Sequence, residues 1–221
     1  MYRRKIIPLA IGFLLASLVV VNAAVFAYRW MKVEITVNQP TQASGVACTG
    51  FYSSSEQSGI SPTYLPEAGK NYNAETYGSN TINVTPGNIV CQWTGVTTTY
   101  YLYDSITVSM TVTNGSWYIK DLYGFGYNGS AATDPTVYVW IRVEQPVTGV
   151  NYAYLQVYNA TDNSLVAKID LTTGSFTRGS PPFEMLPGKA FQLDLNISIA
   201  NTGDYSFKVG FYVSQQGEAP R

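Results

Sequence analysis

The sequence predicts an all-β protein, a single β-sandwich (Ig-like or jelly-roll-like) of about eight to ten strands that follows an N-terminal apolar leader helix. Two observations lead to this prediction. Apolar and polar residues alternate with a period of two in one segment after another, which is the pattern of strands with one buried face. Turn residues separate these segments, and no segment beyond the leader has a helical period. The 221 residues suit one such domain, with a barrel as the alternative architecture.

Residues 1–27 have the features of a secretory signal peptide. Three basic residues at positions 3–5 precede an apolar run that ends at Ala27, and small residues near its end fit a cleavage site. We favour cleavage after Ala27, because it leaves the first strand close to the new N-terminus. Cleavage after Ala23 and an uncleaved membrane anchor are the alternatives. In each case the rest of the protein is expected to be extracellular, at the cell surface, and to contact the membrane only through the leader.

The first strand is predicted directly after the leader, at residues 31–38, and Pro40 ends it because proline cannot donate to a sheet. Strict alternation gives this strand one apolar face that has to be buried. The functional question is whether it joins the sheet of its own domain or that of a neighbouring copy. On the second interpretation, residues 28–42 are a donor strand and residues 43–221 are the sandwich domain. The apolar positions are Met31, Val33, Ile35 and Val37.

The rest of the chain is predicted to alternate between strands and loops. Residues 53–80 are expected to form a long surface loop. Residues 124–129 spell G-x-G-x-x-G, but no helix follows to hold a pyrophosphate, so we expect a loop and no dinucleotide site. Tyr205 follows a turn in the manner of a tyrosine corner. Strands are expected at 46–52, 89–94, 99–113, 117–123 (after an Asn-Gly turn), 137–144, 152–158, 165–171, 193–199 and 205–213.

The composition argues against an enzyme, a metal site or a nucleic-acid partner. The chain has no histidine, which excludes histidine bases, histidine-containing triads and imidazole metal ligands. Three of its 13 basic residues precede the apolar run, which leaves 10 basic and 14 acidic residues after it. That balance provides no basic patch for phosphates. Because no catalytic motif is present either, we expect no enzymatic activity and no cofactor.

Two cysteines, Cys48 and Cys91, lie beyond the leader. In an oxidising exterior, an even number of cysteines indicates a disulfide. Closing a loop of this length stabilises a fold by roughly 4 kcal/mol on the loop-entropy estimate. A pair of free buried thiols is the alternative.

Five N-x-S/T sequons make this protein a candidate glycoprotein. Each can carry a glycan if the chain is exported, and attached glycans would shield the surface. We expect at least two to be occupied. Asn196 alternates with the inward residues of its strand, so it should point outward. The five asparagines are Asn83, Asn114, Asn128, Asn159 and Asn196.

The chain resembles the β-sandwich fibre subunits of archaea, the bundling-pilus and thread proteins, which are related to the bacterial matrix protein TasA and to camelysin. The features that carry the resemblance are the leader ending at Ala27, the VEITV strand that follows it, the ASGVACTGFYSS region with its cysteine, and the closing ISIANTGDYSFKVGFYV segment. The resemblance implies a homopolymer held by donor-strand complementation, in which each N-terminal strand completes the next subunit's sandwich. The residues that it assigns to the donor strand are Val33, Ile35 and Val37, with Met31.

The predicted function is therefore a structural subunit of a pilus-like extracellular filament that supports adhesion, cell–cell contact or biofilm formation. One alternative is a secreted or membrane-anchored β-sandwich module that binds surface glycans on a tyrosine-rich face formed by Tyr152, Tyr154 and Tyr158. An extracellular hydrolase is the third interpretation.

Overall fold

The computed structural model describes residues 29–38, 48–52, 74–77, 80–94, 99–129, 132–201, 205–215 and 217–219. The predicted leader, residues 1–27, lies outside this part of the chain. Among the described residues the protein is all-β and has no helix, and so no helix that could cross a membrane. The strands are β1 (Arg29–Asn38), β2 (Cys48–Tyr52), β3 (Ala74–Tyr77), β4 (Asn80–Pro86), β5 (Ile89–Thr94), β6 (Thr99–Tyr103), β7 (Ser105–Val112), β8 (Gly115–Asn128), β9 (Val137–Gln145), β10 (Tyr152–Asn159), β11 (Leu165–Asp170), β12 (Phe176–Arg178), β13 (Phe183–Met185), β14 (Ala190–Ile199) and β15 (Tyr205–Ser214).

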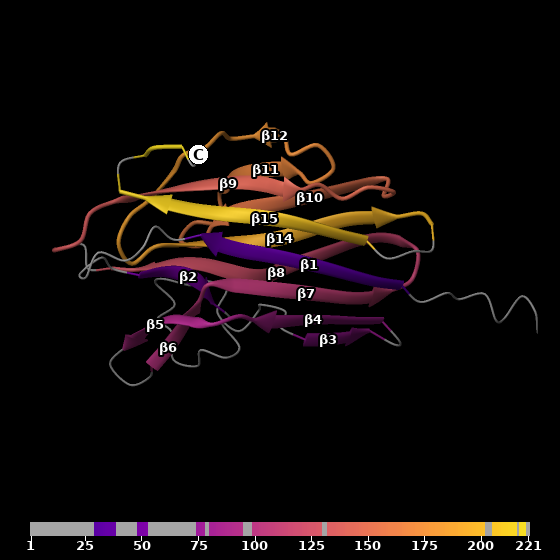
Figure 1. The fold of residues 1–221 in the computed structure, drawn as a ribbon, viewed down its shortest axis with the longest axis horizontal. Coiled ribbons are helices and arrows are strands. Elements are labelled where there is room, and N and C mark those ends of the chain that lie inside the picture. The colour runs from indigo at the N-terminus through magenta and orange to yellow at the C-terminus, as the bar shows by residue number, and fades with distance from the viewer. Residues whose placement is uncertain are drawn as a thin grey trace, which may run out of the picture.

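The strands form two open sheets in a sandwich-like arrangement (Figure 1). The seven-stranded sheet has the order β13-β9-β15-β1-β7-β4-β3, and the eight-stranded sheet has the order β12-β11-β10-β14-β8-β2-β6-β5. Adjacent strands are antiparallel except for β1 and β15, which are parallel. In Figure 1 the indigo β1 lies between the yellow β15 and β7.

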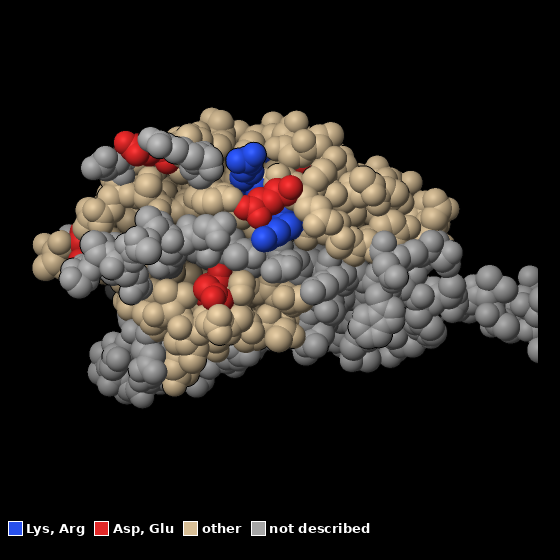
Figure 2. All heavy atoms as spheres, viewed as in Figure 1, with Lys and Arg blue, Asp and Glu red and all other residues tan. Residues whose placement is uncertain are grey.

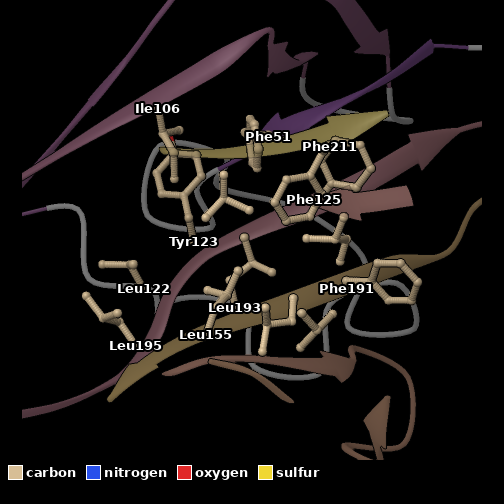
Figure 3. Close-up of a cluster of buried hydrophobic side chains, with 14 of the residues drawn as sticks. Phe51, Ile106, Leu122, Tyr123, Phe125, Leu155, Phe191, Leu193, Leu195 and Phe211 are labelled. Atoms are coloured by element: carbon tan, nitrogen blue, oxygen red, sulfur yellow. The ribbon is translucent and has the colours of Figure 1, made fainter. Parts of the chain in front are cut away.

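Both sheets contribute to one core, which has three phenylalanines at its centre. Phe51 and Phe125 come from the eight-stranded sheet, and Phe211 comes from the seven-stranded sheet. The ring centroid of Phe211 is 5.2 Å from that of Phe51 and 5.0 Å from that of Phe125. Figure 3 shows the three rings pointing toward one another. Aromatic contacts of this kind stabilise a core beyond the burial of their area, so this cluster ties the two sheets together.

Several strand predictions are confirmed. The predicted strands at 89–94, 152–158 and 205–213 correspond to β5, β10 and β15, and β2 occupies most of the predicted strand at 46–52. The tyrosine-corner prediction is also confirmed, because the hydroxyl of Tyr205 donates to the carbonyl of Asn201 at 2.7 Å. The strand number is larger than predicted, since fifteen strands are described. Several of the additional strands are short, such as β12 and β13, which have three residues each.

The single long strand predicted at 99–113 is wrong. The chain breaks at Asp104, and β6 and β7 belong to different sheets. The Asp104 carboxylate accepts hydrogen bonds from the backbone N–H of Asn88 at 2.9 Å and from the Ser105 hydroxyl at 2.8 Å. These bonds fix a corner at which the chain passes from one sheet to the other. Asn114-Gly115 is a second such passage, and it does not form a hairpin, because β7 and β8 are in different sheets.

The loop predicted at 124–129 is also wrong, because residues 124–128 belong to the paired strand β8. Glycine is needed here for close packing and not for a turn. A Cβ built on Gly124 would lie 2.1 Å from Cζ of Tyr52, and Tyr52 is itself buried. The tyrosine ring therefore packs directly against the backbone of β8 at this position.

The predicted disulfide joins Cys48 of β2 to Cys91 of β5. These two strands are not hydrogen-bonded neighbours, because β6 lies between them in the sheet order. The disulfide adjoins a second, smaller buried cluster on this sheet. That cluster consists of Cys48, Tyr52, Leu102, Ala160 and Ala190. The disulfide thus fastens the edge of the eight-stranded sheet, where the strands are short.

Candidate assembly site around the first strand

The first strand occupies an interior position in its own chain's sheet. β1 is parallel to β15 on one side and antiparallel to β7 on the other. β15 also pairs with β9, and β7 also pairs with β4. Between β15 and β7 there is consequently a position for one strand, which we call the β1 slot. In this single chain the slot is filled by the chain's own N-terminal strand.

The register of β1 against β15 places its predicted apolar positions opposite buried residues. Val33 pairs with Phe207, Ile35 with Val209, and Val37 with Phe211. All three partners on β15 belong to the main core and are at most 2% exposed. Because directly opposed residues lie on the same face of a sheet, the alternation predicted from sequence is in phase with the core-facing residues of β15.

The register of β1 against β7 also places the apolar positions of β1 opposite buried residues. Val33 pairs with Val108 and Ile35 with Ile106, and both partners on β7 are fully buried. Met31 pairs with Met110 on β7 and with Tyr205 on β15. The side chains of Met31, Val33, Ile35 and Val37 lie outside the described part of the structure, and their assignment to a donor strand stays a prediction. Their backbone positions show that the slot is lined by core residues on both sides.

The positions of β1 between the apolar ones, such as Glu34 and Thr36, align with the outer face of the sheet. A small group of polar and charged side chains lies on this face, around Glu144. Lys208 Nζ lies 3.4 Å from Oε2 of Glu144, and the Tyr212 hydroxyl donates to the same carboxylate. Figure 2 shows positively and negatively charged residues close together near the centre of this face. Exposed ion pairs of this kind contribute little to stability. Gly210 pairs with Thr36 of β1, and a Cβ at Gly210 would lie 2.7 Å from both Glu144 Oε1 and the Tyr212 ring.

The sequons are distributed over both sheets, and the structure leaves their occupancy a prediction. Asn114 donates from Nδ2 to the carbonyl of Ala200 at 3.1 Å. Oδ1 of Asn159, the last residue of β10, accepts from the backbone N–H of Thr161 at 2.8 Å. Asn83 lies inside β4 and Asn128 ends β8. Asn83 is paired on both sides, with Ala74 and Ser109, although the sequence around it is rich in turn residues.

The tyrosine-rich face is on the outer side of the eight-stranded sheet. Tyr152 and Tyr154 of β10 stack with ring centroids 5.7 Å apart, and Nζ of Lys168 lies 4.1 Å above the Tyr154 ring. Tyr158 accepts a hydrogen bond from Nε2 of Gln156 at 3.1 Å. The three predicted tyrosines thus share one face. Within the described ranges no group of three or more cysteines or carboxylates could hold a metal ion.

Two features of the sheets could not be recognised from the sequence. The first is the parallel pairing of the first strand with the last, because a period of two indicates a buried face and not a partner. The second is the carboxylate of Asp194, which is only 2% exposed on the outer face of β14. It accepts hydrogen bonds from the Tyr118 hydroxyl and, at 2.8 Å, from the backbone N–H of Asp121. Alternation alone assigns Asp194 to solvent.

No protein-family model matches this chain, and no curated protein sequence is significantly similar to it.

Proposed function

We propose that this protein is the structural subunit of an extracellular, pilus-like filament that polymerises by donor-strand complementation. The observation that carries the proposal is the position of β1, the first described strand, between β15 and β7. In a filament, β1 of one copy would occupy the β1 slot of the next. The finer architecture that we propose is Ig-like or jelly-roll-like, behind a signal peptide of residues 1–27 cleaved after Ala27. Such cleavage would leave β1 one residue from the new N-terminus.

An interior slot suits strand exchange because a foreign strand can make the same contacts as the chain's own. Both edges of the slot offer backbone donors and acceptors, which should not remain unpaired when buried. Each fully buried aliphatic side chain contributes roughly 1.5–3 kcal/mol, and each backbone hydrogen bond about 0.5–1.5 kcal/mol net. Summed over the apolar positions of β1, this is a strong attachment between subunits. An empty slot, in contrast, would expose two strand edges that promote uncontrolled association.

The connection of β1 to the rest of the chain supports exchange as well. Nine residues, 39–47, separate β1 in the seven-stranded sheet from β2 in the eight-stranded sheet. Fully extended, nine residues span at most about 30 Å, which is long enough to reach a neighbouring subunit. The closed chain and the filament would then use identical strand contacts and differ only in which copy supplies β1. High subunit concentration would favour the filament, because the chain's own strand competes intramolecularly.

The glycan-binding alternative has weaker support. It requires ring faces that a sugar can cover, and the Tyr154 ring is already in contact with Tyr152 and with the Lys168 ammonium group. We therefore favour the filament, with the tyrosine-rich face as part of its exterior.

A synthetic peptide of residues 29–38 tests the proposal. Added in excess to dissociated full-length subunits, it is expected to fill the β1 slot and to suppress filament formation, because a slot occupied by a peptide cannot accept a neighbour's strand. Electron microscopy and light scattering measure the suppression, and a peptide of the same composition in scrambled order is the control. Filaments that form equally well with both peptides would contradict the proposal.

A further inference from the structure

The sequon asparagine Asn196 lies in the middle of β14, on the outer face of the eight-stranded sheet. Its register partners are Tyr154 on β10 and Tyr118 on β8. Asn196 is half-buried, and its side chain makes no hydrogen bond to any other residue in the described part of the chain. The sequon is completed by Ser198. A glycan attached at Asn196 would therefore start between two tyrosines.

The Tyr118 residue is fixed at its backbone and at its hydroxyl group, while its ring is exposed to solvent. Its backbone is paired in β8, and its hydroxyl donates to Oδ2 of Asp194 on the neighbouring strand. Asp194 is buried, yet Tyr118 is 52% exposed. Because both ends of the side chain are fixed, the exposed half is mostly ring surface that lies across the sheet. Tyr118 is the register partner of Asn196 on the β8 side.

The Asp194 carboxylate makes this arrangement rigid. Its Oδ1 accepts from the backbone N–H of Asp121 at 2.8 Å, at the point where the register of β8 and β14 shifts. Burial raises the pKa of Asp194, and its hydrogen bonds to Tyr118 and Asp121 oppose that rise. On the β10 side, Tyr152 stacks on Tyr154 and Lys168 lies over the Tyr154 ring. The Tyr154 ring beside Asn196 is therefore held in place by Tyr152 and Lys168. The Tyr118 ring on the other side of Asn196 is exposed to solvent.

We propose that this face contacts the protein's own N-linked glycan: the first sugars attached at Asn196 pack against the ring of Tyr118. Neighbouring strands are about 4.8 Å apart, so a pyranose ring on Asn196 reaches the adjacent tyrosine without rearrangement. The C–H groups on one side of a pyranose ring are attracted to the negative face of an aromatic ring. The proposal rests on the extracellular location in the proposed function, and it is independent of how subunits assemble.

Hydroxyl-radical footprinting of the protein from its own cells tests the proposal. Glycopeptide mass spectrometry should find a glycan at Asn196. Oxidation of Tyr118 should be several-fold slower in wild-type protein than in the Asn196→Gln variant, because the glycan covers the ring. Tyr138, on the seven-stranded sheet, is the control whose oxidation should not change. A bare Asn196, or equal oxidation of Tyr118 in the two proteins, would overturn the proposal. Protection of Tyr118 by an added soluble oligosaccharide while Asn196 is bare would instead indicate a binding site for free glycans.

A thermodynamic cycle gives a second readout. Tyr118→Leu should lower the Tm of the glycosylated protein by about 2–4 °C more than it lowers the Tm of Asn196→Gln, as expected for loss of one aromatic contact in a protein of this size. Tyr118→Phe keeps the ring and should have the same effect in both backgrounds. Equal losses for Tyr118→Leu in the two backgrounds would contradict the contact. Filament formation by wild-type protein is measured separately, so failure of assembly and failure of the glycan contact are distinguishable.

Discussion

Replacing Ile35 by aspartate is expected to abolish filaments and leave soluble subunits. Ile35 lies in register between Ile106 of β7 and Val209 of β15, both fully buried. A carboxylate in that row would be buried without a partner, which costs several kcal/mol. The altered strand would be excluded from the slot of a neighbour and also from the slot of its own chain. The subunits should therefore be less stable than wild type and carry an open slot.

The wild-type peptide of residues 29–38 should bind these Ile35→Asp subunits and raise their Tm, because it supplies the missing strand. Electron microscopy measures the loss of filaments, and calorimetry measures the recovery of stability. Lys32→Asp is a matched control on the same strand, since Lys32 pairs with the exposed Ser206 and should leave assembly intact. An Ile35→Asp protein that unfolds and is not restored by the peptide would show that β1 serves only its own domain.

Removing the disulfide by a Cys48→Ala/Cys91→Ala double substitution is expected to lower the free energy of unfolding by roughly 4 kcal/mol, on the loop-entropy estimate for a sequence separation of 43. For a chain of this size that corresponds to a fall in Tm of about 10 °C. The effect should be greatest at the β2–β6–β5 edge, because the disulfide joins two strands there that do not pair with each other. Thermal unfolding measures the overall loss.

Hydrogen exchange of the double-cysteine variant locates the loss. Amides of β5 and β6 should exchange faster than in wild type, whereas those of the paired strands β10 and β14, far along the sheet order, should change little. Wild-type protein treated with a reductant should reproduce the effect. An unchanged Tm in both the variant and the reduced protein would contradict this role of the disulfide.

The all-β class, the phase of most strands and the tyrosine corner could be predicted because their signals are local, and the disulfide could be predicted because the chain has two cysteines. The alternation of apolar and polar residues shows which face of a strand is buried. The same alternation can continue where the chain turns a corner from one sheet to the other, so it does not reveal the corner. Leu102 and Ile106 have the same parity on the two sides of Asp104, yet Leu102 belongs to the smaller cluster and Ile106 to the main core. The break at Asp104 is therefore hidden in the pattern. Its cause is hydrogen bonding of the Asp104 carboxylate to the adjacent Ser105 and to Asn88, which lies sixteen residues earlier, between β4 and β5.

Other features depend on contacts that are distant in sequence. The sequence predicts a loop at Gly124 because glycine commonly marks turns, whereas in the structure Gly124 makes room for the Tyr52 ring. Strands of three residues, such as β12, contain too few positions to show alternation. For the candidate assembly site, the apolar positions of β1 could be identified, but its two partners could not, because β1 and β15 are the first and last of the described strands.

The most direct measurement of the central claim is disulfide trapping in a Val33→Cys/Val108→Cys variant. These positions are register partners on β1 and β7, so a bond between them records which copy fills the slot. Filaments oxidised and then denatured without reductant should give a ladder of covalent multimers, because each β1 is linked to the next subunit. Single-cysteine variants should give no ladder. Filaments that dissolve entirely into internally cross-linked monomers would contradict donor-strand complementation.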